Sequence, residues 1–407
     1  MADRRGGLLI EVENEQVTDG SAAKTHNALD KAEPTLPIHW YYDPDQYQRE
    51  LEGVFYSSWL YLCRAEALAE PKSYQSMSVG NQHLFVVRSE SGKLAGYYNV
   101  CRHRGAMLIN DESGCLTGDS VACPYHRWRY ALEDGSLLRV SSFREPDGFD
   151  SGDYGLFPVA VREWRGFVFV HLDPAAEWDV DAVFNGEQTL LDNFSIEQHV
   201  LGQRWVKTIE CNWKTFWDNY SECLHCPGVH PELIKVQPIY KRGLLVEDDH
   251  PDWHEHRDNP DPSHRGGLAI GAETWSTDHS AQGYADHSGL SEQDIARGVT
   301  YATAYPGMYI AGFADHTRTV RILPLGPERV EMTVEWLVQP AALADPDYKI
   351  ENIVEFVQQV LLEDGEVCEL TQRGMHARPM RRGVLMPEEY EVKAFKDWLL
   401  MRLEKTS

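Results

Sequence analysis

Two short motifs, each with one cysteine and one histidine, constrain the fold of this chain more than any other feature. Cys101-x-His103 is followed, after nineteen residues, by Cys123-x-x-His126, and each motif comes just after residues typical of a strand. Two thiolates and two imidazoles can close a four-ligand metal site. Zinc fingers, however, pair cysteine with cysteine and histidine with histidine along the chain. The mixed motifs therefore make structural zinc the weaker interpretation of this site.

The residues around these motifs predict a small domain of short strands. Apolar runs such as 78–88 and 166–172 are bounded by turn residues, which is typical of antiparallel sheets. From Tyr41 to Glu66, aromatic and aliphatic residues recur at helical intervals and predict a helix that leads into the domain. We therefore expect an all-β domain with a leading helix over residues 37–174.

Bulk composition excludes several classes of partner. The 407 residues include 64 acidic and 38 basic side chains, a formal net charge of −26, so the surface repels nucleic acid and anionic membranes. No apolar run reaches the length of a membrane span, and Leu8-Leu9-Ile10 is too short for an export signal. Residues 1–36 are polar and predict a flexible N-terminal arm. We expect a cytoplasmic protein whose eight cysteines are reduced thiols or metal ligands.

A second candidate metal site lies near the middle of the chain. His225 and His230 are five residues apart, and Glu222 precedes the first histidine by about one helical turn. Pro227-Gly228, between the histidines, predicts that a helix ends or bends there. Such a break lets His230 turn back toward His225, which a straight helix does not allow at this spacing. The two imidazoles are candidate metal ligands that need a third.

The third ligand is predicted on a helix far along the chain. Residues 345–375 carry an apolar stripe at helical spacing, and this stripe runs through Asp364. An unpaired carboxylate on a buried face is costly, so Asp364 needs a metal or a cationic partner such as Arg373. Glu363 lies off the stripe and is the weaker candidate. With the two histidines, Asp364 would complete the set that holds Fe(II) and leaves positions open for O2.

The remaining pattern predicts an α+β fold. Strands are expected at 299–305, 308–313, 317–323 and 330–339, forming an antiparallel sheet with the ligand helices on one face. We assign this catalytic domain to residues 175–407.

Two further features have more than one interpretation. Cys223-x-x-Cys226 fits zinc or redox chemistry, but no second thiol pair lies nearby, so both cysteines are interpreted as packing residues. The segment 248–289 is rich in histidine and aspartate, but its irregular spacing is typical of a solvated loop. A long loop of this kind often acts as a lid.

With these motifs in order, the chain resembles the oxygenase (α) component of Rieske non-haem iron oxygenases, from about residue 37 to the C-terminus. The landmarks are the two Cys/His motifs, Asn212-Trp213-Lys214, Glu222-x-x-His225-x4-His230, and Glu363-Asp364 followed by Gln372-Arg373-Gly374. The resemblance implies a [2Fe–2S] cluster with Cys101 and Cys123 on one iron and His103 and His126 on the other. Arg127 departs from the family pattern, which usually has glycine there.

The resemblance also implies partners and co-substrates. Electrons would come from NAD(P)H through a flavin/iron–sulfur reductase or a ferredoxin, and would pass from the cluster to a mononuclear iron that activates O2. In the family, the cooperating cluster and iron belong to neighbouring subunits of a trimer, so we expect a homotrimer. A carboxylate three residues before the first iron histidine links the two centres. Here it is Glu222, which would connect His225 with His126 of the partner subunit.

Residues 219–233 are most similar to the branch of this family that acts on glycine betaine, choline, carnitine and stachydrine. This similarity implies hydroxylation of an N-methyl group on a small quaternary ammonium substrate, with release of formaldehyde. Aromatic faces bind such cations, although aromatic residues are also ordinary core. The candidate pocket residues are Trp217, Tyr220, Tyr305, Tyr309 and Phe313. The alternatives are hydroxylation of an aromatic ring, and a Rieske protein that only transfers electrons.

Overall fold

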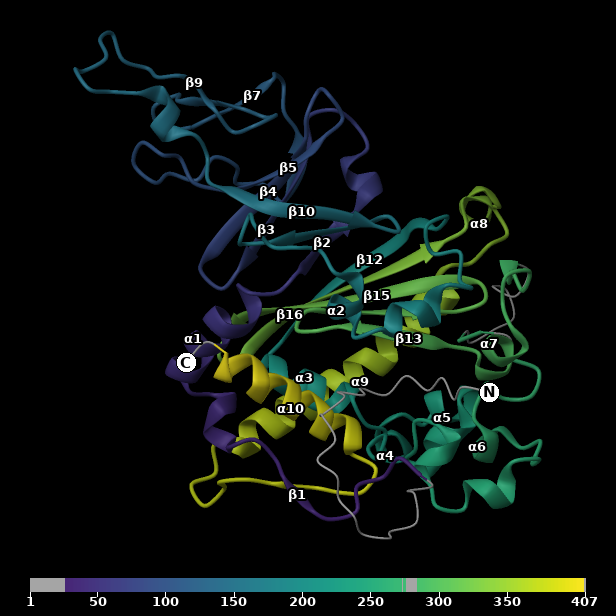
Figure 1. Ribbon diagram of the computed structural model, residues 1–407. Coiled ribbons are helices and arrows are strands. Elements are labelled where there is room, and N and C mark those ends of the chain that lie inside the picture. The colour runs from purple at the N-terminus through teal and green to yellow at the C-terminus, as the bar shows by residue number, and fades with distance from the viewer. Residues whose placement is uncertain (1–25, 273, 276–283, 406–407) are drawn as a thin grey trace, which may run out of the picture. The chain divides into compact units, whose positions relative to one another are not determined.

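A computed structural model describes residues 26–272, 274–275 and 284–405 (Figure 1). The chain divides into two compact units, and each is described by itself. The β unit comprises Leu51–Asp179 and Tyr305–Met308. The α+β unit contains the described residues up to Glu50, Val180–Ala304, and those from Tyr309 onward.

The predicted N-terminal arm, residues 1–36, lies outside the described residues in its first 25 positions. Its last part is packed rather than free, because Ala28 and Leu36 are buried and β1 (Glu33–Pro34) pairs with β17 (Val384–Leu385). Among the described residues, no helix is long and apolar enough to cross a membrane.

The β unit contains a seven-stranded antiparallel sheet, in the order β2-β11-β10-β5-β4-β3-β6, and a three-stranded sheet, β7-β8-β9. The strands are β2 (Leu60–Arg64), β3 (Ser73–Val79), β4 (Gln82–Arg88), β5 (Leu94–Tyr98), β6 (Ser113–Cys115), β7 (Ser120–Ala122), β8 (Arg129–Ala131), β9 (Leu137–Arg139), β10 (Pro158–Trp164) and β11 (Phe167–His171). Three short helices join them, η2 (Leu51–Phe55), η3 (Ala65–Leu68) and η4 (Ser151–Tyr154).

A glycine permits one of these pairings. A Cβ on Gly96 of β5 would stand 2.5 and 2.7 Å from side-chain methyl groups of Val161 and Val159 on β10. Real Cβ atoms do not come so close, so β5 and β10 can pair only with glycine at this position.

The predicted helix from Tyr41 to Glu66 is wrong in its second half. Helix α1 (Pro44–Glu50) continues only through η2 to Phe55, and Leu60–Arg64 forms β2 instead. Every residue of β2 is buried. A short run buried on all sides has no alternation, so periodicity alone does not separate it from a buried helix.

The α+β unit has a five-stranded sheet with helices on one face, so the predicted fold class is confirmed (Figure 1). Its order is β12-β16-β15-β14-β13, and β16 is antiparallel to both of its neighbours. The strands are β12 (Val200–Ile209), β13 (Thr300–Ala304), β14 (Met308–Gly312), β15 (His316–Gly326) and β16 (Arg329–Val338). The predicted strands of this region therefore match the structure closely.

Helices α3 (Trp213–Tyr220), α9 (Glu351–Met375) and α10 (Tyr390–Glu404) cover the sheet, with α3 against β15 and α9 against β12 (Figure 1). The shorter helices are η1 (Ile38–Tyr41), α2 (Val180–Phe184), η5 (Glu187–Leu191), α4 (Cys226–Val229), α5 (Leu233–Val236), η6 (Pro238–Arg242), η7 (Glu247–Asp249), η8 (Trp253–His256), α6 (Pro262–Arg265), α7 (Glu292–Arg297) and α8 (Pro340–Ala344). The predicted helix over 345–375 is confirmed as α9.

Buried polar side chains fix α3 in place. Lys214 Nζ and Glu50 Oε2 are 2.7 Å apart with both side chains fully buried, and Trp213 Nε1 donates to the same oxygen at 2.7 Å. Asn212 caps the helix by accepting from the Lys214 amide. The backbone N–H of Asn212 donates to Gln372 Oε1 of α9 at 2.9 Å. The helix is thus tied to α1 at one side and to α9 at the other.

Candidate active site

The two Cys/His motifs form matching turns. Cys101 N donates to Ala106 O and Gly105 N to Cys101 O, and Cys123 N and Arg127 N make the corresponding bonds to Trp128 O and Cys123 O. The fifth residue of each turn has a positive φ, 78° at Gly105 and 60° at Arg127. Arginine therefore occupies a left-handed position that glycine adopts without steric cost.

The four predicted ligands of these turns lie together. Both cysteines are buried, and Cys101 is within hydrogen-bonding reach of Cys123. The rings of His103 and His126 are 4.7 Å apart, with His103 exposed and stacked on Trp128 at 4.8 Å. The thiols thus face the interior and the imidazoles face outward.

Two observations show that these side chains fit an iron–sulfur cluster. His126 Nδ1 is buried and has no hydrogen-bond partner among the described residues, so its lone pair is available to a ligand. Burial, followed by the charges of His126 and Arg104, lowers the pKa of His103, which keeps this imidazole neutral as metal binding requires.

The predicted iron histidines follow α3 in a tight bend. Helix α3 ends at Tyr220, before Glu222, so the predicted helical turn between Glu222 and His225 is absent. The two side chains still meet, with Glu222 Oε1 2.6 Å from His225 Nδ1. We expected a helix to end or bend at Pro227. Instead, Pro227 stands in the first turn of α4, where its missing N–H is tolerated. His230 then caps that helix and returns toward His225, with the ring centroids 5.2 Å apart.

Helix α9 brings Asp364 to both histidines. Asp364 Oδ1 lies 3.3 Å from His225 Nε2 and 2.9 Å from His230 Nε2. Glu363, the weaker candidate, contacts the other nitrogen of His230, Nδ1, at 2.8 Å. Glu363 is thereby placed to orient His230, and Glu222 to orient His225. Both Nε2 atoms point to one place, which is the arrangement that a shared metal ion requires.

The charges of this group fit a divalent cation. Burial opposes ionisation of Asp364, but hydrogen bonds from His225 and His230 outweigh it and lower the pKa of the carboxyl. Burial likewise opposes protonation of His225, yet hydrogen bonds to Asp364 and Glu222 raise its pKa to about 9. Three carboxylates therefore surround two imidazoles. Hard oxygen and imidazole donors with net negative charge suit Fe(II).

The prediction that every cysteine is a free thiol or a metal ligand is wrong for one pair. Cys223 and Cys226 form a disulfide that encloses Leu224 and His225, with Cα atoms 5.0 Å apart. The tight bend after α3 brings both buried side chains to the same side. The C-x-x-C spacing was the available signal. The other six cysteines form no disulfide.

The predicted aromatic residues do not all lie in one place. Tyr220 stacks on Tyr309 at 4.3 Å between ring centroids, and Tyr301, which sequence reasoning missed, lies 6.1 and 6.0 Å from these two. Trp217 is fully buried and packs on Phe395 of α10. Tyr305 belongs to the β unit, so its place in a pocket stays a prediction.

Phe313 belongs to a third set. It stacks on His316 at 4.2 Å, and Arg318 Cζ lies 5.3 Å from its ring. Sequence reasoning also missed Arg318, although a cation within an apolar strand was a usable signal.

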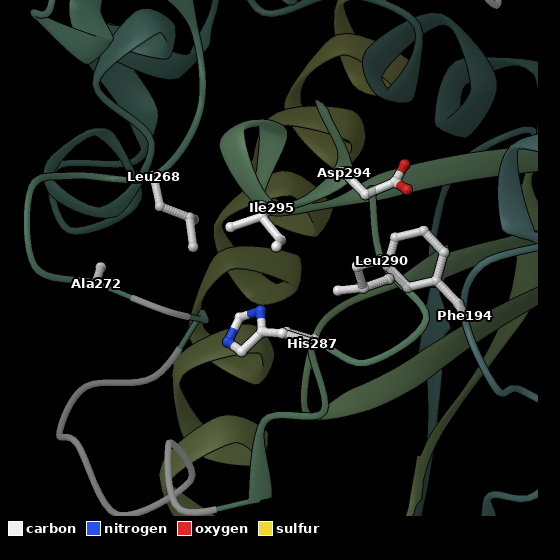
Figure 2. Close-up of a pocket in the computed structure, with 9 residues that line it drawn as sticks. Phe194, Leu268, Ala272, His287, Leu290, Asp294 and Ile295 are labelled. Atoms are coloured by element: carbon white, nitrogen blue, oxygen red, sulfur yellow. The ribbon is translucent and has the colours of Figure 1, made fainter. Parts of the chain in front are cut away.

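Two cavities of the α+β unit contain none of the predicted iron ligands. The one in Figure 2, lined by residues including Phe194, Leu268 and Ile295, measures about 60 Å³ and has room only for water. A larger one, about 640 Å³, lies between η1, the end of α9 and α10. Asp218, one of two half-buried acids in its lining, accepts a hydrogen bond from Tyr41 at 2.6 Å. Neither carries the chemistry of the site.

A second histidine and carboxylate group occurs in the predicted loop, of which residues 273 and 276–283 lie outside the described part. Asp252, His256 and His264 are close enough to share an ion. Arg242, however, donates to Asp252 at 3.2 Å and to His264 Nδ1 at 2.9 Å. The positive charge of Arg242 thus already occupies the place that a metal ion would take.

Comparisons with known proteins match both parts of the chain. The family model described as the ring hydroxylating alpha subunit (catalytic domain) matches residues 190–405, and that of the Rieske [2Fe-2S] domain matches residues 58–149. Chloroplastic choline monooxygenase of Spinacia oleracea is 29% identical over 378 residues, which cover 91% of this chain and 78% of that protein. The glycine betaine monooxygenase oxygenase subunit of Chromohalobacter salexigens is 28% identical over 411 residues, covering 91% and 87%.

Solved structures share the fold. A quaternary ammonium Rieske monooxygenase whose structure addresses carnitine oxidation has a TM-score of 0.68 at 20% identity, covering 90% of this chain and 95% of that one. Naphthalene 1,2-dioxygenase from Rhodococcus sp. has a TM-score of 0.69 at 20% identity, covering 92% and 95%. The fold therefore does not separate the two substrate classes.

Proposed function

Because the chain belongs to the family of Rieske-type ring-hydroxylating oxygenase α subunits, we propose that it is the oxygenase component of a monooxygenase that removes an N-methyl group from a quaternary ammonium compound. The observation that carries the proposal is the convergence of His225, His230 and Asp364 beside an aromatic group. Relatives named for choline, glycine betaine and carnitine support the substrate class.

Family membership gives the cofactors as a Rieske [2Fe–2S] cluster and a mononuclear non-haem iron, with O2 and electrons from a reductase. When bound, these groups supply single-electron transfer and activation of O2. We assign Cys101 and Cys123 to one iron of the cluster and His103 and His126 to the other. The free Nδ1 of His126 supports the assignment.

At the mononuclear site, His225, His230 and Asp364 would hold the iron. Glu222 would then accept a hydrogen bond from Nδ1–H of His225, and Glu363 one from Nδ1–H of His230. These bonds fix the tautomer that leaves Nε2 of each ring free for the metal. Such partners orient the rings and raise their strength as donors.

The substrate cation would lie against the tyrosines. Tyr220 and Tyr309 present stacked rings, and burial raises the pKa of both hydroxyls, so the rings stay neutral and polarised toward a cation. In the overall reaction, one oxygen atom of O2 enters a methyl C–H bond. The other leaves as water with two electrons and two protons. The hydroxymethyl group then departs as formaldehyde, and the C–N bonding pair stays on nitrogen with a proton.

We also propose a homotrimer in which Glu222 links His225 to His126 of the partner subunit. In support, Tyr125 beside His126 is 58% exposed and Met107 is 39% exposed, so apolar side chains are exposed next to the cluster motifs. In Glu222→Gln we expect both metal centres to remain bound while single-turnover electron transfer slows about 10- to 100-fold. Transfer at the wild-type rate would contradict the link. The cytoplasmic location stays a prediction.

The experiment that tests the function combines iron analysis with product analysis. We expect about three iron atoms per chain, two in the cluster and one mononuclear, and loss of the third in His225→Ala. With reductase and O2, N-methylated cations should yield formaldehyde. Turnover of aromatic acids with no formaldehyde from any N-methyl compound would favour ring hydroxylation. Absence of the third iron in the wild type would favour an electron-transfer protein.

A further inference from the structure

Arg318 is a buried cation that has no counter-ion among the described residues. It is the third residue of β15 and is 3% exposed. Among the residues that the structure describes, no carboxylate forms an ion pair with it, and its Nε and Nη1 have no hydrogen-bond partner. The acid nearest in sequence, Asp315, is engaged with Thr274 at 2.6 Å and His316 at 2.8 Å. An unpaired buried charge costs several kcal/mol, so a partner is expected from beyond the described residues.

The walls around Arg318 are aromatic. Its guanidinium carbon lies 5.2 Å from the ring of Trp275 and 5.3 Å from that of Phe313. These rings shield the cation from water, which strengthens any ion pair formed there.

The same guanidinium reaches the tyrosines of the candidate active site. Burial raises the pKa of Tyr309 and of Tyr301. The charge of Arg318 and hydrogen bonds from it oppose this rise, whereas the charge of Asp364 adds to it. Both tyrosines therefore lie within electrostatic reach of Asp364 and of Arg318. The ring centroids of Tyr301 and Tyr309 are 6.0 Å apart, and Tyr309 stacks on Tyr220. One group of aromatic rings therefore lies between Asp364 and Arg318.

We propose that Arg318 binds a carboxylate of the substrate, so that the substrate is a zwitterion with an N-methylated cation near the iron ligands and a carboxylate at β15. This inference rests on the proposed function and narrows it to betaines, as opposed to amino alcohols such as choline. Guanidinium groups suit carboxylates because they offer several fixed donors and stay charged.

The chain offers a matched control on the same strand. Arg321 is 8% exposed and lies three residues further along β15, so its side chain points to the other face of the sheet. Unlike Arg318, it has a carboxylate partner, with Glu331 Oε1 at 3.4 Å. Arg321→Gln reports the effect of removing a buried arginine from β15 without touching the site.

The test measures binding to the holoenzyme through spectral changes at the iron, with glycine betaine, its methyl ester and choline as probes. Wild type should bind glycine betaine more tightly than the other two. Arg318→Gln should raise the Kd for glycine betaine about 10- to 100-fold and leave the other two nearly unchanged. Arg318→Lys should recover part of the loss, and Arg321→Gln should change none of the three.

Two results would overturn the proposal while leaving N-demethylation intact. One is a wild type with no preference for the free carboxylate over its ester, which needs no variant. The other is equal weakening of all three probes in Arg318→Gln, which would make Arg318 a structural cation between two rings. If no N-methyl compound binds or reacts with the wild type, the proposed function itself fails.

Discussion

The cluster turns take their shape from main-chain hydrogen bonds within six residues, whereas the iron site depends on side chains that lie 134 residues apart. In the turns, Cys101 and Cys123 are positioned by two repeated backbone bonds each. At the iron site, His230 meets Asp364 because the hydrogen bond from Asn212 N to Gln372 Oε1 ties the start of α3 to α9, while the buried pair of Lys214 and Glu50 ties α3 to α1. The shape of the cluster turns thus depends on nearby backbone hydrogen bonds. The geometry of the iron site depends on charged side chains from distant segments.

The largest expected effect comes from removing Asp364. In Asp364→Ala we expect loss of the mononuclear iron and a fall in turnover of more than about 100-fold, because a ligand matters more than the residues that orient it. The visible spectrum of the cluster should not change. Iron analysis and substrate turnover measure the effect, with Glu366→Ala on the exposed side of α9 as the control. Retention of the third iron would remove Asp364 from the ligand set.

The reverse experiment targets the cluster. Cys123→Ser should abolish the cluster spectrum and turnover while one mononuclear iron per chain remains, because the two sites share no ligand. Electron paramagnetic resonance and iron analysis measure the two centres separately. Joint loss of both centres would show that the sites are not independent, and the comparison would fail.

A smaller effect concerns buried acids of the α+β unit. Burial raises the pKa of Glu187 to about 7, although its carboxylate accepts from Thr303 N at 2.7 Å. Since the folded pKa exceeds the unfolded value, this group stabilises the fold below about pH 4.5, and that contribution is lost as pH rises through 7. We expect Glu187→Gln to reduce the loss of stability between pH 5.5 and 8.5 by about 1–3 kcal/mol. Thermal unfolding at several pH values measures it, and an unchanged profile would contradict it.

The smallest effect should come from the turn that breaks the family pattern. Arg127 has φ 60° where the matching turn has Gly105 at φ 78°. In Arg127→Gly we expect a gain of up to about 1 kcal/mol in the stability of the β unit, because the left-handed strain is removed. Gly105→Ala should lose a similar amount, and since a Cβ there meets no atom within 4 Å, that loss would be purely conformational. Destabilisation by both changes would show that Arg127 makes a compensating contact.

The same comparison explains what could be predicted. The cluster motifs and the Asp364 stripe are local patterns, so the sequence was sufficient to find these candidate ligands. Tyr301 and Arg318 approach the site only through the register of β13, β14 and β15, which no local pattern specifies. The Cys223–Cys226 disulfide depends on the bend after α3, and α3 ended earlier than its continuous pattern indicated. The substrate depends on such distant contacts, so it was the hardest feature to predict.

The buried pair of Lys214 and Glu50 has a consequence for how this protein can evolve. Neither residue can change alone without leaving an uncompensated charge inside the protein, at a cost of about 3–5 kcal/mol, although replacing both by apolar residues is often neutral. Positions 50 and 214 should therefore vary together among homologues. Since α3 leads directly into the histidine bend, a change at residue 50, remote in sequence, can alter the geometry of the catalytic centre across lineages.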